Sequence, residues 1–200
     1  MDVKNKRVVV TGAASGIGKA LCEAFHQAEA KTVIAVDMNL EGAQDTADSV
    51  NGIAVQANVG NEEEIINVIQ KADEHAGGTD IFCSNAGIGG VPGFFEVGAS
   101  DWQNIWDVNV QSHIFAAKHV LPQMIDRGEG YLVNTSSAAG LLTQLGAAGY
   151  SVPKAAAVSF AEWVILDKGT IIFLKGNCSK LCNNHRTESR SFASVRMHTI

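Results

Sequence analysis

A tyrosine and a lysine four residues apart stand in the segment GAAGYSVPKAAA, residues 146–157. On a helix, Tyr150 and Lys154 would lie one turn apart on the same face. A free phenol ionises near pH 10, too high for a base at neutral pH, but a nearby ammonium favours the phenolate. The pair is therefore suited to moving a proton to or from a substrate hydroxyl. The alternative for an isolated pair at this spacing is a surface contact of a helix.

A glycine-rich turn near the N-terminus is a second candidate site. The segment TGAASGIG, residues 11–18, lies between an apolar run and an amphipathic one. Glycines at such a turn let a pyrophosphate approach the start of the helix, where free N–H groups and the helix dipole favour anions. A tight turn without a ligand is the alternative. The residues expected to contact a dinucleotide here are Gly12, Ser15, Gly16, Ile17 and Gly18.

An acidic residue supports the dinucleotide interpretation. Asp37 lies 19 residues after Gly18, at the end of the second apolar run. A carboxylate at this place can accept hydrogen bonds from a ribose diol and would repel a 2′-phosphate. Met38 and Asn39 follow it, where arginine or lysine would have indicated NADP, so the sequence predicts NAD. The alternative for Asp37 is a solvated helix N-cap.

Apolar strands and amphipathic helices alternate along the chain. Strands are predicted at residues 6–11, 32–36, 52–57, 80–85 and 131–136. Helices are predicted at residues 17–29, 39–50, 62–76, 100–107, 109–127 and 150–166. Continuous apolar strands joined by helices indicate parallel pairing with helices on both faces. Right-handed crossovers then give an α/β fold with a doubly wound, Rossmann-like parallel sheet.

Three motifs in order resemble the short-chain dehydrogenase/reductase family: T-G-x-x-x-G-I-G at 11–18, S-N-A-G at 84–87 and Tyr150-x-x-x-Lys154. The resemblance covers about residues 5–166. It implies an NAD(H)-dependent oxidoreductase that transfers a hydride between the nicotinamide and a secondary alcohol or ketone. Tyr150 would be the general acid/base, and Lys154 would lower its pKa and bind the nicotinamide ribose.

The resemblance also implies roles for residues outside these motifs. Ser137, in NTSS, matches the catalytic serine that binds the substrate oxygen, with Ser136 as the alternative. Asn109 matches an asparagine that holds a water for proton exchange with Lys154. The remaining cofactor contacts that the resemblance implies are Asn58, Val59, Asn85, Ala86 and Gly87. Asn58 stands where the family usually has aspartate, so it keeps an acceptor and a donor without the charge.

Pro153 departs from what a helix through Tyr150 and Lys154 would prefer. Proline inside a helix removes a backbone hydrogen bond and clashes with the carbonyl four residues earlier. A helix that begins at residue 149 or 150 would place Pro153 in its first turn, where N–H groups have no helical partner. Val152 is still pushed away from helical geometry, which would move Tyr150 relative to Lys154.

The sequence changes character after residue 167. Residues 169–175, GTIIFLK, are a candidate sixth strand, and residues 176–200 show no helical or strand period. We expect an incomplete dinucleotide-binding oxidoreductase domain at 1–175 and a disordered basic tail at 176–200. The family's Pro-Gly loop, substrate segment and seventh strand are not recognisable. The alternative function is therefore a weak or inactive truncated product that binds dinucleotide or associates with a full-length relative.

Composition limits the other classes of protein to which the chain could belong. With 200 residues, 46% of them hydrophobic and 18% charged, the chain suits one globular domain. It has no apolar run of membrane-spanning length and no leader, so we expect a cytoplasmic protein without membrane or nucleic-acid partners. Cys178, Cys182 and His185 lack a clear fourth ligand, and no metal site is predicted. The expected partners are a small-molecule substrate, a hydrophobic alcohol or ketone, and further copies of this chain in a homo-oligomer.

Overall fold

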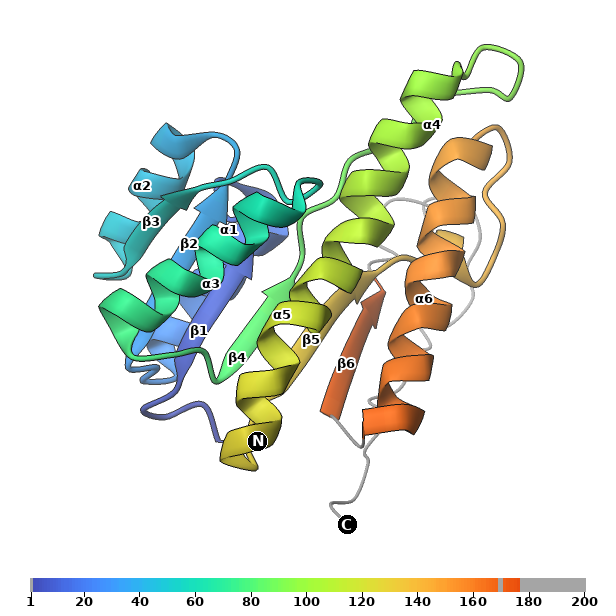
Figure 1. Ribbon diagram of the computed structural model, residues 1–200. Helices are drawn as coiled ribbons and strands as arrows, with labels where there is room; N and C mark the ends of the chain where they lie inside the picture. The colour runs from blue at the N-terminus through green and yellow to red at the C-terminus, as the bar shows by residue number, and fades with distance from the viewer. Residues whose placement is uncertain (1, 169–170, 177–200) are drawn as a thin grey trace, which may run out of the picture.

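The computed structural model describes residues 2–168 and 171–176. Its strands form one parallel sheet in the order β3-β2-β1-β4-β5-β6. Their bounds are β1 (Arg7–Thr11), β2 (Thr32–Asp37), β3 (Ile53–Gln56), β4 (Ile81–Ser84), β5 (Tyr131–Ser136) and β6 (Ile171–Gly176). The strand order reverses between β1 and β4, which confirms the doubly wound prediction (Figure 1). In such sheets a ligand crevice forms at the carboxyl ends of the strands where the order reverses.

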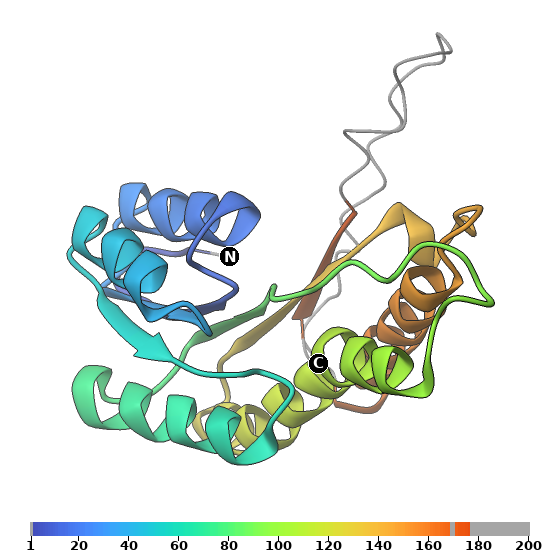
Figure 2. The same cartoon turned by 90° about the horizontal axis from the view of Figure 1, so that it is seen from above.

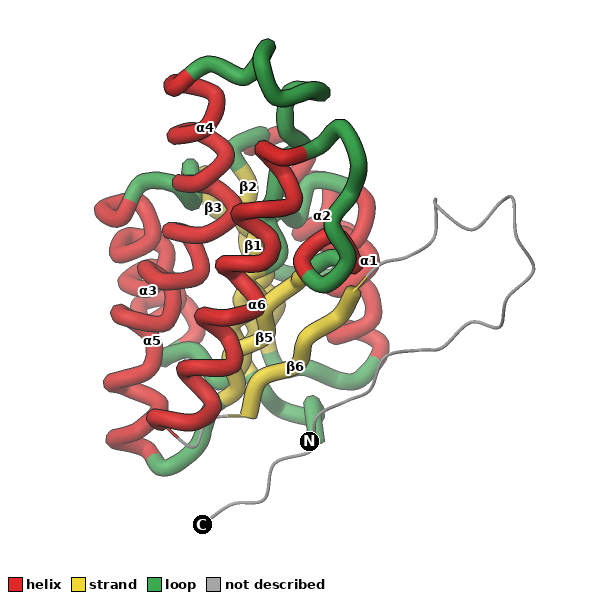
Figure 3. Tube along the Cα trace, turned by 90° about the vertical axis from the view of Figure 1, so that its right-hand side faces the viewer, coloured by secondary structure: helices red, strands yellow, loops and turns green. Residues whose placement is uncertain are grey.

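The helices lie in two layers, one on each face of the sheet (Figures 2 and 3). The first layer contains α1 (Gly16–Gln27) and α2 (Leu40–Ser49). The second contains α3 (Glu62–Ala76), α5 (Ser112–Arg127) and α6 (Ala148–Lys168). The chain also forms α4 (Ala99–Trp106), the π-helical segment η1 (Asp107–Gln111) and the short 3-10 helix η2 (Ala138–Gly140).

Alternate strand residues supply two apolar cores. Val9, Phe82 and Leu132 face the layer of α3, α5 and α6. Their neighbours Val8 and Ile81 face α1 and α2. Because successive side chains of a strand point to opposite faces, each apolar strand serves both cores at once. This explains why the strands read as continuous apolar runs.

The two helices predicted at residues 100–107 and 109–127 are joined without a break. Residues 107–111 form the π-helical segment η1, which connects α4 to α5. A π-helical turn holds one more residue than an α-helical turn and occurs often at functional sites. The extra residue lets Asn109 reach the backbone of Ile88, with which it makes two hydrogen bonds.

Pro153 lies deeper in its helix than the sequence predicted. The helix α6 begins at Ala148, and the N–H of Ser151 donates to the carbonyl of Ala147 at 2.9 Å. Pro153 is therefore the sixth residue of α6, and the first-turn prediction is wrong. Without an N–H, Pro153 leaves the Gly149 carbonyl without its helical donor. Val152 is nevertheless helical, and the Pro153 ring is buried.

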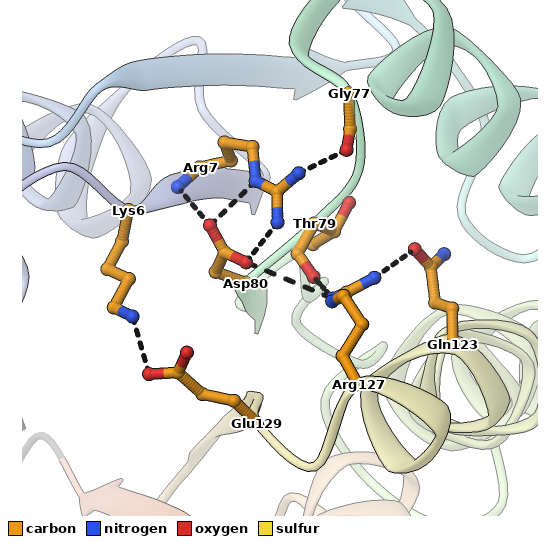
Figure 4. Close-up of polar contacts among 8 residues, drawn as sticks. All are labelled: Lys6, Arg7, Gly77, Thr79, Asp80, Gln123, Arg127 and Glu129. Carbon is orange, nitrogen blue, oxygen red and sulfur yellow. Dashed lines mark hydrogen bonds and ion pairs between the residues drawn. The ribbon is translucent and has the colours of Figure 1, made fainter.

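A charged network lies at the amino ends of the central strands, where it joins the start of β1, the residue before β4 and the end of α5 (Figure 4). Asp80 accepts hydrogen bonds from the backbone N–H of Arg7 at 2.9 Å and from its Nε at 2.7 Å. Arg127, at the end of α5, donates to the carbonyl of Thr79 at 2.5 Å. Burial alone would raise the pKa of Asp80, but the hydrogen bonds and charge of Arg7 hold that pKa below its ordinary value.

Some expectations concern residues that the structure does not describe. Of the tail predicted at 176–200, Gly176 belongs to β6, and the rest lies outside the described residues, as does the cluster of Cys178, Cys182 and His185. Within the described ranges, no group of acidic, histidine or cysteine side chains could hold a metal ion. The described helices also include none that is both long and apolar enough to cross a membrane.

Candidate active site

A cavity of about 710 Å³ lies at the carboxyl ends of the central strands. It is lined by the glycine-rich turn, by the loop after β4, by the end of β5 and by the start of α6. Of the predicted site residues, it gathers Gly12, Ser15, Gly16, Ile17, Gly18, Asp37, Asn85, Ala86, Gly87, Ser137, Tyr150 and Lys154. Asn58, Val59 and Asn109 are not part of its lining.

Two glycines of the glycine-rich turn, Gly12 and Gly18, are packed too closely for side chains. A Cβ on Gly18 would lie 1.9 Å from the Gly12 carbonyl oxygen, and one on Gly12 would lie 2.8 Å from the Ala86 Cα. Gly12 and Gly16 also have φ values of +69° and +55°, which favour glycine. Ser15 is the N-cap of α1, and its side chain caps no N–H group. The start of α1 therefore keeps its first-turn donors available to an anion.

Asp37 lies at the end of β2 and faces the same cavity. Its two carboxylate oxygens accept hydrogen bonds from the N–H groups of Ala14 at 3.0 Å and Asn39 at 2.9 Å. Asn39 is the N-cap of α2, so the N-cap alternative for Asp37 is wrong. Each carboxylate oxygen retains acceptor capacity, which suits the hydroxyl groups of a ribose.

Two threonines that the sequence analysis left without a role hold the loop after β4. The Thr11 hydroxyl accepts from the N–H groups of Asn85 at 3.0 Å and Ala86 at 3.1 Å. The Thr135 hydroxyl donates to the Asn85 Oδ1 at 3.0 Å. Each threonine is a polar residue near the end of an apolar strand, and this is the signal in the sequence that could have indicated its role. Together they orient the Asn85–Gly87 segment along the cavity wall.

Asn58 makes local contacts near the cavity. Its Oδ1 accepts the N–H of Gly60 at 3.0 Å, and its own N–H donates to Glu64 at 2.7 Å. The Asn58 side chain is exposed, whereas Val59 is buried. The adenine contact expected of this pair stays a prediction.

Asn109 is fully buried in η1 and bonded to one backbone segment. Its Oδ1 accepts the N–H of Ile88, and its Nδ2 donates to the Ile88 carbonyl, both at 2.9 Å. A Cβ on Gly87 would lie 3.1 Å from the Asn109 Oδ1 and 3.3 Å from the Lys154 Nζ. Asn109 thus fixes the loop after β4 and approaches Lys154 across Gly87. A side chain at Gly87 would crowd both groups, so Asn109 or Lys154 would have to shift by a few tenths of an ångström.

Lys154 is the buried cation of the cavity, with only 4% of its surface exposed. Its Nζ donates to the Thr135 carbonyl at 3.3 Å and lies 5.9 Å from the centre of the Tyr150 ring. Burial lowers the pKa of Lys154 to about 8. The ammonium is therefore still the main form of Lys154 at neutral pH, and it places a positive charge beside the Tyr150 ring.

The two serines at the end of β5 differ in surroundings. Ser137 is the N-cap of η2, and its Oγ accepts the N–H of Ala139 at 3.2 Å. The hydroxyl hydrogen of Ser137 remains able to donate to a group in the cavity. Ser136 is buried, and its Oγ has no partner among the described residues. This contrast favours Ser137 over Ser136 as the substrate contact, which stays a prediction.

Comparison with known proteins identifies the family. Residues 6–170 match the family model for short chain dehydrogenases. The chain is 33% identical over 164 residues to the 3-oxoacyl-[acyl-carrier-protein] reductase FabG of Vibrio cholerae, covering 81% of this chain and 67% of that protein. It is 31% identical over 172 residues to the meso-2,3-butanediol dehydrogenase of Serratia marcescens, covering 84% and 68%.

A solved structure agrees with the sequence matches. The short chain dehydrogenase/reductase of Burkholderia phymatum, in complex with NAD, superposes with a TM-score of 0.83 at 27% identity. The match covers 88% of this chain and 65% of that one. The chain therefore belongs to the short-chain dehydrogenase/reductase family of oxidoreductases. It spans about two thirds of the length of these relatives.

Proposed function

We propose that this chain carries the catalytic site of an NAD(H)-dependent oxidoreductase that interconverts a secondary alcohol and a ketone. The observation that carries the proposal is the placement of Tyr150, the buried Lys154 and Ser137 in one cavity with the glycine-rich turn. This is the combination of a proton donor, a cation that tunes it, a hydroxyl that binds oxygen and an anion-binding helix start.

The residues present fit a dinucleotide. The start of α1, with its unfilled N–H groups, and the side-chain-free surface of the turn would hold the pyrophosphate. Asp37 would accept the hydroxyls of the adenosine ribose, and Lys154 would bind the nicotinamide ribose. When bound, the nicotinamide supplies or accepts the hydride.

The proton is handled by the chain itself. In oxidation, the Tyr150 phenolate removes the hydroxyl proton, and in reduction the phenol returns it to the carbonyl oxygen. The Lys154 ammonium favours the phenolate by charge, since it lies beside the Tyr150 ring. Ser137 donates to the substrate oxygen and keeps it next to Tyr150. Asn109 holds the loop after β4 in place, and it would also hold the water that exchanges protons with Lys154.

NAD is the proposed form of the cofactor. A 2′-phosphate on the adenosine ribose would meet the Asp37 carboxylate, and the following residues Met38 and Asn39 carry no positive charge. We therefore expect NADH to bind more tightly than NADPH.

The proposed substrate is hydrophobic and uncharged. Leu145, which lines the cavity, is 95% exposed, and Phe95, on the loop whose residues Ile88–Gly90 and Pro92 also line it, is 92% exposed. The loops at residues 88–98 and 137–147 contain no lysine or arginine. A substrate with a substantial apolar part would cover these side chains, whereas an anionic one would find no countercharge on them.

Two measurements on the purified 200-residue chain test the proposal. Thermal unfolding is followed with NADH and with NADPH, and turnover is followed with NAD and a panel of secondary alcohols. We expect NADH to raise the melting temperature more than NADPH, and turnover to depend on Tyr150. Tyr150→Phe should lower kcat by about 10²- to 10⁴-fold while the NADH shift persists. Stabilisation by NADH without turnover would favour the alternative, a chain that binds dinucleotide without catalysis.

A further inference from the structure

Four buried polar side chains lie together behind Lys154, between the sheet and the layer of α5 and α6. Ser84 on β4 and Asn134 on β5 are neighbours in the sheet register, and Ser136 follows on the same face of β5. His113 of α5 contacts Asn134, with 3.1 Å between its Nδ1 and the Asn134 Oδ1. All four residues are at most 8% exposed, and the proposed hydride transfer uses none of them.

Each of these side chains keeps a polar atom without a partner. Among residues 2–168 and 171–176, nothing hydrogen-bonds to the His113 Nε2, the Asn134 Nδ2 or the hydroxyls of Ser84 and Ser136. Proteins seldom bury such atoms unsatisfied, and four in one layer indicate a small polar ligand. Internal water is the ligand that ordinarily satisfies such groups, through about three hydrogen bonds each.

The cluster adjoins the backbone that holds Lys154. The Lys154 Nζ donates to the carbonyl of Thr135, the residue between Asn134 and Ser136 on β5. Asn134 and Ser136 therefore flank the residue whose carbonyl binds the ammonium, and the charge of Lys154 acts on His113.

His113 is neutral in this setting and can act as an acceptor. Burial lowers the pKa of His113 to about 4, and the charge of Lys154 acts in the same direction. With the Asn134 Oδ1 as acceptor, the His113 Nδ1 carries the hydrogen and Nε2 offers a lone pair. A water that donates to Nε2 presents its oxygen to other donors, including an ammonium.

No carboxylate competes for this role. The strands β4 and β5 contain no acidic residue, Glu162 of α6 is exposed, and Tyr150 and Lys154 of α6 line the cavity. On α5, Lys118 and His119 are bound instead to Glu62 of α3 on the outer side. The acceptor that the ammonium has among the described residues is neutral, the Thr135 carbonyl.

We propose that His113, Asn134 and Ser136 bind one or more internal waters behind Lys154, and that His113 is a positioning residue that holds the Lys154 ammonium through this water. The importance of the ammonium for catalysis rests on the proposed function. The water site itself does not, because its test needs no turnover.

The test measures the pKa of Lys154 by NMR of its side chain in the full 200-residue chain. His113→Asn keeps an amide near the Nδ1 position and removes the group at Nε2, whereas His113→Gln places an amide near Nε2. We expect His113→Asn to lower the Lys154 pKa further by roughly half a unit to one unit, because the ammonium loses a stabilising contact. His113→Gln should restore the wild-type value. The matched control His119→Gln, on the outer side of α5, should leave it unchanged.

A second measurement uses only the wild-type protein. A long-lived water should give nuclear Overhauser contacts to the His113 ring protons. Absence of such a water, or equal Lys154 pKa values in His113→Asn and His113→Gln, would overturn the proposal. If His113→Asn does not fold, the water contact and the His113→Gln value decide. A confirmed water site in a chain without turnover would overturn the proposed function alone.

Discussion

At the scale of single residues, Lys154 combines a cost in stability with a role in the site. Burial takes its pKa from the ordinary 10.5 to about 8, so the folded state binds fewer protons than the unfolded state between these values. Stability should therefore rise with pH across this window, and the full cost of burying the charge applies below pH 8.

Lys154→Met should remove that cost. We expect the free energy of unfolding at pH 7 to increase by about 1–3 kcal/mol, while turnover is lost. The gain should shrink as the pH rises from 8 to 10.5, because the wild-type lysine then loses its proton. Urea unfolding at several pH values measures this, with the exposed Lys31→Met as the control. A Lys154→Met protein less stable than the wild type at pH 7 would contradict the argument.

At the scale of the elements, the turn between β1 and α1 depends on missing side chains. Gly18→Ala would place a Cβ 1.9 Å from the Gly12 carbonyl oxygen, so the backbone of the turn must move. We expect a loss of about 1–3 kcal/mol in unfolding free energy and a smaller NADH-induced thermal shift. Gly89→Ala is the control, since its Cβ would meet nothing within 4 Å, and it should change stability by less than about 0.5 kcal/mol.

Replacing the proline of α6 should raise the unfolding free energy, whereas Gly18→Ala should lower it. Alanine at residue 153 would supply the N–H that the Gly149 carbonyl lacks and remove the clash of the proline ring. Two effects oppose this gain: the burial of the proline ring is lost, and the unfolded chain gains conformational freedom. We expect Pro153→Ala to raise the unfolding free energy by about 1–2 kcal/mol. Chemical denaturation measures it beside Val152→Ala, which changes an exposed neighbour; equal effects of the two substitutions would count against the helix argument.

At the scale of the whole molecule, the Arg7–Asp80 network joins segments far apart in the chain (Figure 4). The Asp80 pKa is lowered from 3.8, so its contribution to stability is present above that value and is lost as the pH falls through the folded-state pKa. Asp80→Asn should cost about 1–3 kcal/mol at pH 7, because Arg7 and Arg127 lose their carboxylate.

The difference between Asp80→Asn and wild type should narrow in acid, once the wild-type carboxyl is protonated. Unfolding free energies from pH 7 down to about pH 2, below the ordinary carboxyl pKa, measure this. Glu129→Gln is the control, because the Glu129 side chain is 56% exposed and its ion pair with Lys6 should be worth less than about 1 kcal/mol. A constant difference across the pH range would show that Asp80 acts through its shape alone.

The layout of the fold followed from sequence, because its signals are local. Apolar runs separated by amphipathic helices predicted the parallel sheet, and the glycine spacing predicted the turn at β1. Helix junctions were less predictable. The π-helical turn at Asn109 depends on its bonds to Ile88, and the start of α6 at Ala148 moved Pro153 beyond the first turn.

The sequence by itself determined the family, the order of the elements and the residue types that gather at one cavity, because motif spacing and apolar period act over short distances. Tertiary structure decided what each side chain meets. It assigned Thr11 and Thr135 to the loop after β4, left Asn58 in local contacts and buried His113 behind Lys154. The contacts of Thr11, Thr135 and His113 join strands and helices distant in the chain, so no local pattern encodes them. The packing that buries Lys154 and lowers its pKa also places its Nζ 5.9 Å from the centre of the Tyr150 ring.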